Sequence, residues 1–398
     1  MLAKMARIAL IAEEMGRHED AMAVSLRLTE AAQVWLNGTA SAPLLYDYRW
    51  GGIVSCGCNF DKKVKGYCNN EVSADGCPGL SDVGHNFGLG FYNDHHFHFG
   101  YHIYAAAVAA KFHPDWAMKY FEHVLLLVRD IANPSPSDPF FPLFRHKDWY
   151  LGSSWALGIA TLGGVPYANG RNEESSSEAV NAYDAVALYG HQMAKVFARA
   201  GDMARANTAS HVRDTGRMLS AMEIRSAQVY WHVKAPGTPG SGRIYPEGYK
   251  GKVVGMLWSA LAQMQTWFGS EAWKVFGIQM LPITGVSERL LEKEWVKQML
   301  PDFKESCWDP INPISMCVEQ GWSMLVNVAQ AITGEWRLAR DGILDLPDSA
   351  FEGAGGNGHS RSNMLWFIST QRTDEEDAAE EEEVGAGEYG DDDGATGP

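Results

Sequence analysis

Apolar residues recur at helical spacing along most of this 398-residue sequence, and this pattern limits the fold more than any other feature. Glycine- and proline-rich loops separate the helical segments, and no convincing run of alternating strands appears before the C-terminal tail. The pattern predicts a mainly α domain. The helices follow one another at intervals of roughly 30 residues, which is long for a simple bundle with short loops. A toroid of paired helices, (α/α)6-like, with a site built from loops at one end, fits better. The predicted helical segments are 1–36, 100–132 with a break at Pro114, 148–162, 177–201, 203–224, 252–269, 287–300 and 315–333.

The acidic charge of the chain is concentrated at its C-terminus. The formal net charge is −16, but residues 373–398 hold 12 Asp and Glu and no Lys or Arg. That segment lacks the apolar residues needed to offset ordering entropy, so we expect a disordered tail after a domain at 1–372. The domain itself is mildly acidic, which argues against a nucleic-acid partner.

Targeting signals are not evident in the sequence. No run of 18 or more apolar residues predicts a membrane span. The N-terminus does not resemble a signal peptide, because Glu13 and Glu14 interrupt its apolar stretch.

Six cysteines leave two interpretations open. Disulfides would imply an oxidising compartment, and free thiols are the alternative. The spacing does not match a tandem zinc ribbon. The six are Cys56, Cys58, Cys68, Cys77, Cys307 and Cys317.

The segment Asn93–His102 combines one carboxylate, four histidines and several aromatic residues. Asp94 in an aromatic, partly desolvated wall has its charged form disfavoured, which raises its pKa. A raised pKa suits a general acid. A metal site is the rival hypothesis, because His95, His98 and His102 would lie roughly on one face of a helix. We favour no metal, since no H-E-x-x-H pattern is present. Structural histidines with buried hydrogen bonds are the third interpretation.

A second carboxylate-rich segment lies at 172–183. Glu174 and Glu178 are four residues apart, so they would share one face of a helix. Ser175 and Glu178 also match a capping box before an apolar run, in which Glu178 would only cap the helix. A glutamate in the first helical turn feels the positive end of the helix dipole, which favours the ionised form that a general base needs.

The sequence resembles family 81 glycoside hydrolases, which are endo-β-1,3-glucanases. The resemblance rests on five segments in the family's order: YNDHHFHFGYHIYAAAVAAKFHPDW at 92–116, DWYLGSSWALG at 148–158, GRNEESSSEAVNAYDAVALYG at 170–190, KVVGMLW at 252–258 and GIQMLPITGVSE at 277–288. It implies an inverting hydrolysis of internal β-1,3-glucosidic bonds in an (α/α)6 toroid, normally preceded by a β-sandwich. It also implies β-1,3-glucan as the partner, an extracellular or cell-wall location and no cofactor. We expect a monomer.

The resemblance also assigns roles to individual residues. Asp94 matches the acid and Glu178 the base, with Glu174 as the neighbouring carboxylate. His98 matches a substrate-contacting histidine. The remaining predicted substrate-binding residues are His95, Tyr92, Trp155, Asn172 and Tyr183.

The sequence departs from the family's pattern in three ways. Ser153 stands where the family usually has histidine, which puts one glucose contact in doubt. Glu173 stands where glutamine is common, and its charge is expected to raise the pKa of nearby acids. The β-sandwich is missing, so the chain is expected to be a fragment or an incomplete gene product. A non-catalytic glucan-binding relative and a different (α/α)6 carbohydrate enzyme are the alternative functions.

Overall fold

The computed structural model describes residues 1–59, 76–159, 165–240, 242–307, 317, 321–352 and 357–372. The predicted acidic tail and Cys68 lie outside the described residues. The described part is mostly helical, so the predicted mainly α fold is confirmed. None of the helices in these ranges is long and apolar enough to cross a membrane.

The helices and strands follow in chain order. The first half contains α1 (Leu2–Glu14), α2 (His18–Leu36), β1 (Leu44–Asp47), β2 (Gly52–Ser55), α3 (His95–Phe112), α4 (Pro114–Ala132), β3 (Asn172–Glu173), α5 (Ser176–Arg199) and α6 (Met203–Tyr230). The second half contains β4 (Met256–Trp258), β5 (Ala262–Gln263), α7 (Ala272–Ile278), α8 (Ser287–Leu290), α9 (Lys293–Cys307), α10 (Ser323–Ile332), α11 (Trp336–Asp345) and α12 (Arg361–Ser369).

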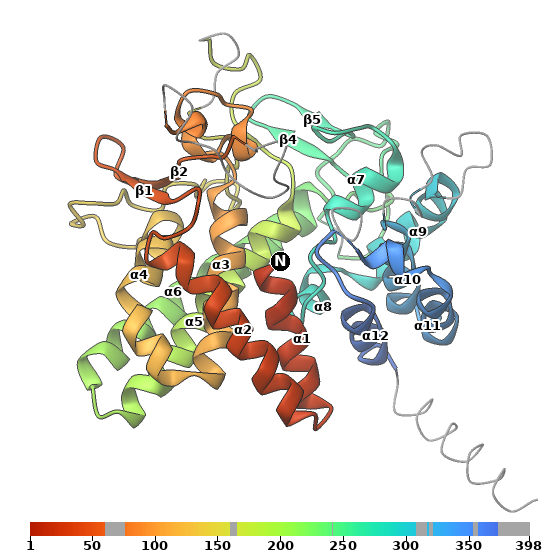
Figure 1. The fold of residues 1–398 in the computed structure, drawn as a ribbon. Helices are drawn as coiled ribbons and strands as arrows, with labels where there is room; N and C mark the ends of the chain where they lie inside the picture. The colour runs from red at the N-terminus through yellow and green to blue at the C-terminus, as the bar shows by residue number, and fades with distance from the viewer. Residues whose placement is uncertain are drawn as a thin grey trace, which may run out of the picture.

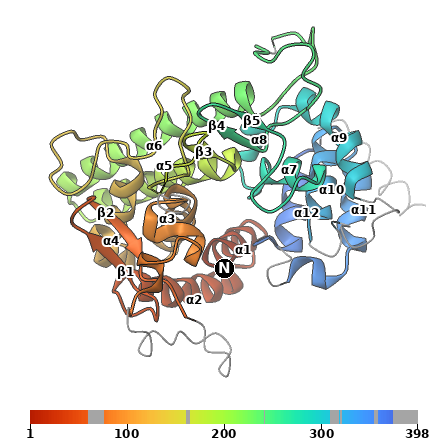
Figure 2. The ribbon, with the colours of Figure 1, turned by 90° about the horizontal axis from the view of Figure 1, so that it is seen from above.

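The helices pack as pairs of chain neighbours (Figures 1 and 2). Helix α1 packs on α2, α3 on α4, α5 on α6, and α10 on both α9 and α11. Helix α3 also contacts α1 and α5, while α12 contacts both α10 and α1. The first and last helices of the described chain therefore meet.

Polar contacts join α1 to the C-terminal part of the described chain, including α12. Lys4 donates a hydrogen bond to the Phe351 carbonyl oxygen at 2.8 Å. Arg7 donates from Nε to Asn363 Oδ1 at 2.9 Å, and its guanidinium lies over the ring of Trp366. These contacts hold α1 against the C-terminal part of the described chain.

Two predicted helices are wrong. Residues 148–162, as far as they are described, form turns and extended backbone, and residues 252–269 contain β4 and β5. Glycine explains the first case: Gly152 has a φ of +76°, and a Cβ at Gly158 would lie 2.4 Å from the Tyr92 carbonyl oxygen. In the second case, β4 is buried along its whole length and pairs with β3, and such a short apolar run cannot be told from a buried helix by periodicity.

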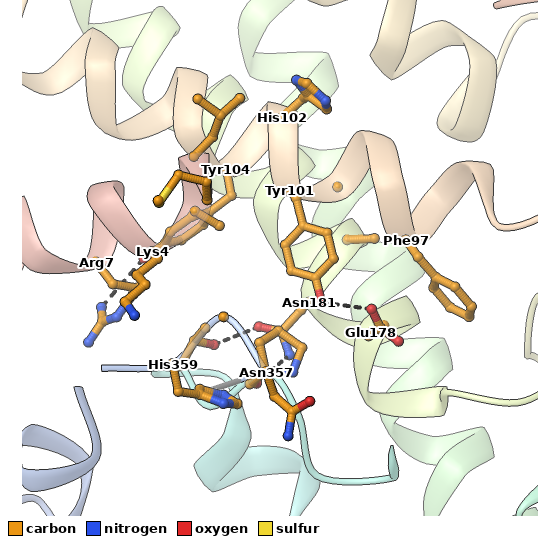
Figure 3. A pocket seen from close by; sticks show the side chains of 18 of the residues that line it. Lys4, Arg7, Phe97, Tyr101, His102, Tyr104, Glu178, Asn181, Asn357 and His359 are labelled. Carbon is orange, nitrogen blue, oxygen red and sulfur yellow. Dashed lines mark hydrogen bonds between the residues drawn. The ribbon is translucent and has the colours of Figure 1, made fainter. Parts of the chain in front are cut away.

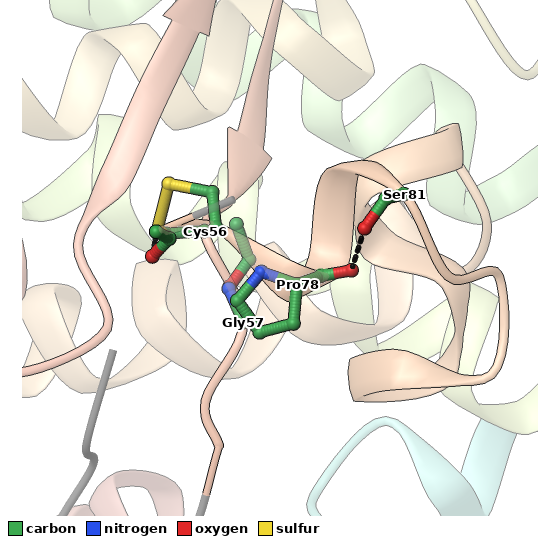
Figure 4. The surroundings of a disulfide bond; sticks show 7 residues. Cys56, Gly57, Pro78 and Ser81 are labelled. Carbon is green, nitrogen blue, oxygen red and sulfur yellow. Dashed lines mark hydrogen bonds between the residues drawn. A yellow bond between two sulfur atoms is a disulfide. The ribbon is translucent and has the colours of Figure 1, made fainter. Parts of the chain in front are cut away.

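Disulfides are the correct interpretation for the described cysteines. Cys56, just after β2, is bonded to Cys77, and Figure 4 shows this bond beside Pro78. Cys307, at the end of α9, is bonded to Cys317. Cys58 is also disulfide-bonded. The Cys56–Cys77 bond fixes the hairpin of β1 and β2 against the segment that leads into α3.

Candidate active site

Asp94 immediately precedes α3, in a left-handed backbone conformation with a φ of +58°. A residue other than glycine adopts this conformation at an energetic cost, and neighbouring contacts hold it there. The Asp94 N–H donates to the Ala156 carbonyl oxygen at 2.9 Å. The Gly158 N–H donates to Asn93 Oδ1, also at 2.9 Å. The segment around Trp155 therefore fixes the direction in which the Asp94 side chain leaves the chain.

Three consecutive serines anchor the N-terminus of α5. Ser175 and Ser177 donate from their hydroxyls to the Ile278 carbonyl oxygen at 3.0 and 2.9 Å. Ser176 donates from both its N–H and its hydroxyl to Gln279 Oε1, and Gln279 Nε2 in turn donates to the Glu174 carbonyl oxygen. Glu174 and Glu178 lie on either side of this clamp, so the end of α7 fixes their backbone.

The capping-box interpretation is correct for Ser175 but incomplete for Glu178. Ser175 is the N-cap, and its hydroxyl accepts from the Glu178 N–H. The Glu178 carboxylate instead accepts a 2.7 Å hydrogen bond from the Tyr101 hydroxyl, which Figure 3 shows reaching from α3. Tyr101 and Glu178 are 77 residues apart in sequence, so sequence reasoning did not select Tyr101 as a site residue.

Glu174 lies beside a group of aromatic side chains. The backbone N–H of Trp267 donates to Glu174 Oε1 at 2.7 Å, and the Trp267 side chain is half exposed. Its indole contacts Tyr167 and Trp258, with ring centroids 5.9 and 5.6 Å apart. Exposed aromatic faces next to a carboxylate form a surface suited to the apolar face of a sugar ring.

The carboxyl groups of Asp94, Glu174 and Glu178 are close enough to influence one another's charge. Burial raises the pKa of Asp94 well above its usual range, and the negative charges of Glu178 and Glu174 raise it further. Burial raises the pKa of Glu174 to about 7, although the Trp267 N–H opposes this change. The sequence predicted that Glu178 would favour its ionised form. Burial instead raises the pKa of Glu178, and the hydrogen bonds with Tyr101 and Ser175 only partly oppose this change. Asp94 thus has the stronger tendency to hold a proton.

Comparison with known proteins identifies the family. The model of the glycosyl hydrolase family 81 C-terminal domain matches residues 1–366. This chain belongs to glycoside hydrolase family 81. A glucan endo-1,3-β-D-glucosidase from Glycine max is 32% identical over 94% of this chain and 48% of its own length. Glucan endo-1,3-β-D-glucosidase 2 from Saccharomyces cerevisiae is 28% identical over 77% of this chain and 33% of its own length.

A solved structure shows the same fold. The family 81 glycoside hydrolase from Clostridium thermocellum superposes with a TM-score of 0.67 at 24% identity, covering 93% of this chain and 43% of its own. The present chain therefore spans about half the length, or less, of the family 81 relatives that it matches.

Glu173 differs from its expected role. Its side chain is fully buried and lies 3.3 Å from His96 Nε2. Burial, followed by the charges of Glu223, Asp94, Glu178 and Glu174, raises the pKa of Glu173 well above its usual range. The charges that raise the pKa of Asp94 are those of Glu178 and Glu174, so the expected effect of Glu173 on nearby acids stays a prediction. Burial lowers the pKa of His96 well below its usual range.

His95 is a structural residue in this family 81 chain. It is fully buried; its Nδ1 lies 2.7 Å from Asp130 Oδ1 and its Nε2 lies 2.9 Å from the Leu89 carbonyl oxygen. Both ring nitrogens therefore already have hydrogen-bond partners, and no polar ring atom is left for a sugar. The prediction of a substrate contact is therefore corrected.

The same contacts bear on the metal hypothesis. His95 cannot ligate together with His98 and His102, because both of its nitrogens are already bonded. His95, Asp130 and His146 bring ligand-type atoms within 4.8 Å of one another. His146 Nδ1 lies 3.0 Å from the Trp155 carbonyl oxygen. His95 and Asp130 are hydrogen-bonded to each other, so we assign them a structural role, whereas His146 Nε2 has no hydrogen-bond partner among the described residues.

Other predicted substrate-binding residues also lie mainly in the packed interior. The Tyr92 hydroxyl donates to Asp47 at 3.0 Å, and Tyr183 shares a 2.9 Å hydrogen bond with Ser154. Asn172 is 1% exposed, and its carbonyl oxygen accepts from the Ala156 N–H. Trp155 is 7% exposed, and its indole donates to Asp148. Of this set, His98 is only partly buried; its pKa is lowered to about 4 by burial, so its ring is neutral near pH 7.

A buried ion pair supports this region. Lys147 and Glu223 lie 2.8 Å apart with side chains only 1% and 2% exposed, and Ser154 donates to the same Glu223 oxygen at 2.6 Å. Replacing Lys147 by methionine leaves an unpaired buried carboxylate, so we expect a loss of about 3–5 kcal/mol in the free energy of unfolding. Denaturant unfolding measures this loss. Lys297→Met is the control, because its pair with Glu294 is exposed and worth at most about 1 kcal/mol. Equal losses in both variants would contradict the prediction.

Proposed function

We propose that residues 1–372 form a catalytic domain that hydrolyses internal β-1,3-glucosidic bonds of β-glucan. The observation that carries the proposal is the convergence of Asp94, Glu174 and Glu178. They come from two different helix starts, yet the Asp94 carboxyl feels the charge of both glutamates. The family 81 relatives named as glucan endo-1,3-β-D-glucosidases support β-1,3-glucan as the substrate.

Asp94 is the proposed general acid and Glu178 the proposed general base of a single displacement. Burial favours the protonated form of Asp94, which can donate a proton to the leaving glycosidic oxygen. Tyr101 and Ser175 favour the ionised form of Glu178, which can accept a proton from the attacking water. Glu174, with a pKa of about 7, is proposed to orient the sugar or the water. Such acid–base chemistry requires no metal or cofactor.

The aromatic surface next to Glu174 supports a carbohydrate substrate. Tyr167, Trp258 and Trp267 meet edge to face or tilted, and the half-exposed Trp267 is held next to Glu174 by its backbone N–H. The described disulfides support a place of action outside the cell, where such bonds persist.

The decisive experiment uses linear β-1,3-glucan and follows the products by size and by proton NMR. We expect a mixture of oligosaccharides early in the reaction and the α-anomer as the first product, because single displacement inverts the anomeric centre. A β-1,4-glucan of similar length is the control and should remain intact. Binding without any cleavage would favour the non-catalytic glucan-binding alternative. An initial β-anomer would exclude Glu178 as a base acting on water.

A further inference from the structure

A cavity of about 560 Å³, open to solvent on one side, lies beside Glu178 and is shown in Figure 3. Helices α1, α2, α3 and α5 surround it, together with the segments 282–284 and 357–363. The polar residues on its wall that matter here are Arg7, Tyr101, Glu178, Asn357 and His359.

His359 requires a partner inside this cavity. It is only 3% exposed, and its Nε2 accepts from the Ile283 N–H at 3.1 Å. Burial lowers the pKa of His359 to about 4, so the neutral ring carries its proton on Nδ1. That Nδ1 has no hydrogen-bond partner among the described residues, and the same holds for Asn357 Nδ2 and Arg7 Nη2. Buried donors of this kind are normally satisfied by water, and the cavity exceeds the volume of many water molecules.

Glu178 is the single carboxylate among the described residues that line the cavity. Tyr101 occupies its Oε1, which leaves Oε2 available to a water molecule. Asp94 and Glu174 do not line this cavity within the described chain. In an inverting hydrolysis, the water attacks from the face of the sugar opposite to the acid. The cavity therefore contacts the base and not the acid, as a water supply must.

We propose that this cavity stores the water that attacks the glucan and delivers it to Glu178 while the polysaccharide covers the outer cleft. The inference rests on the proposed function. The water oxygen bonds to the anomeric carbon as the glycosidic C–O bond breaks. One proton of that water passes to Glu178, and the proton of Asp94 passes to the leaving oxygen. A second water from the cavity then replaces the one consumed.

A crystal structure of the Asp94→Asn variant with a β-1,3-glucan oligomer tests the store directly. We expect ordered water to connect His359 Nδ1 with Glu178, and the sugar rings to remain outside the cavity. A sugar ring inside the cavity would overturn the proposal, because the space would then be a binding subsite. A cavity without ordered water would overturn it as well. Both readouts are independent of turnover.

Filling the cavity tests the supply during turnover. Ala31 on α2 lines the cavity, whereas Ala23 on the same helix is exposed. Ala31→Phe is expected to lower kcat at least about tenfold with an unchanged KM, while Ala23→Phe behaves as wild type. If a structure of Ala31→Phe shows the cavity filled and the variant keeps wild-type kcat, the proposed delivery of water from the cavity is wrong. Failure of the proposed function is separate: wild-type protein would then leave linear β-1,3-glucan intact, whatever the cavity contains.

Discussion

Replacing Asp94 by asparagine is expected to lower kcat on β-1,3-glucan by about 10² to 10⁴, the usual worth of general acid catalysis. Asparagine has nearly the same shape and cannot donate a carboxylic proton. The Asp94 N–H bond to Ala156 and the left-handed backbone are unaffected by the exchange, so binding of glucan oligomers should persist. The loss should therefore fall on kcat and leave KM nearly unchanged.

Initial rates and oligomer binding by calorimetry measure the effect of Asp94→Asn. Asp115→Asn is a matched control, because Asp115 is exposed in the first turn of α4. A variant with more than a tenth of wild-type kcat would contradict the role of Asp94 as the acid. Loss of oligomer binding would instead show that Asp94 mainly holds the substrate.

The pH dependence of activity is a second test of Asp94 as the general acid. As the proposed acid, Asp94 would act in its protonated form, so activity is expected to be lost as pH rises through the pKa of Asp94. Burial and the charges of Glu178 and Glu174 raise that pKa. The alkaline limb of the wild-type profile should therefore lie well above the usual pKa of an aspartic acid, which is about 3.9.

Helix positions were predictable wherever a long periodic pattern ended in a clear local signal. Pro114 correctly marked the break between α3 and α4, because proline is accepted in the first turn of a helix. The segment 252–269 failed because its apolar residues are buried through strand pairing with β3, a contact with residues about 80 positions earlier. Local sequence carries no information about such a partner.

The site shows the same division between local and distant information. The sequence predicted features that depend on residue type and local position. Examples are the Ser175 cap and the carboxylate that precedes α3. The directions of side chains were not predicted. His95 and His98 are three residues apart on one helix, yet His95 points to Asp130 and is fully buried. Gln279 binds the start of α5 from a distant loop, and only the folded chain brings them together.

Glu178→Gln is the second large expected effect, a loss of about 10² to 10⁴ in kcat, because glutamine cannot accept a proton from water. Glutamine preserves the volume of the side chain and can still accept from the Tyr101 hydroxyl through its amide oxygen. The helix start should also persist, since Ser175 and not the Glu178 carboxylate accepts the capping N–H. A loss of activity without a loss of stability therefore separates the base from a cap.

Tyr101→Phe tests the same assignment through pH. The Tyr101 hydrogen bond lowers the pKa of Glu178, so its removal raises that pKa. As the proposed base, Glu178 would act in its ionised form, so activity is expected to be lost as pH falls through the pKa of Glu178. The acid limb of the profile should therefore move to higher pH in Tyr101→Phe, while the alkaline limb, set by Asp94, stays in place. A shift of the alkaline limb alone would contradict Glu178 as the base. If Glu178→Gln kept nearly full activity, Glu174, whose pKa is about 7, would become the candidate.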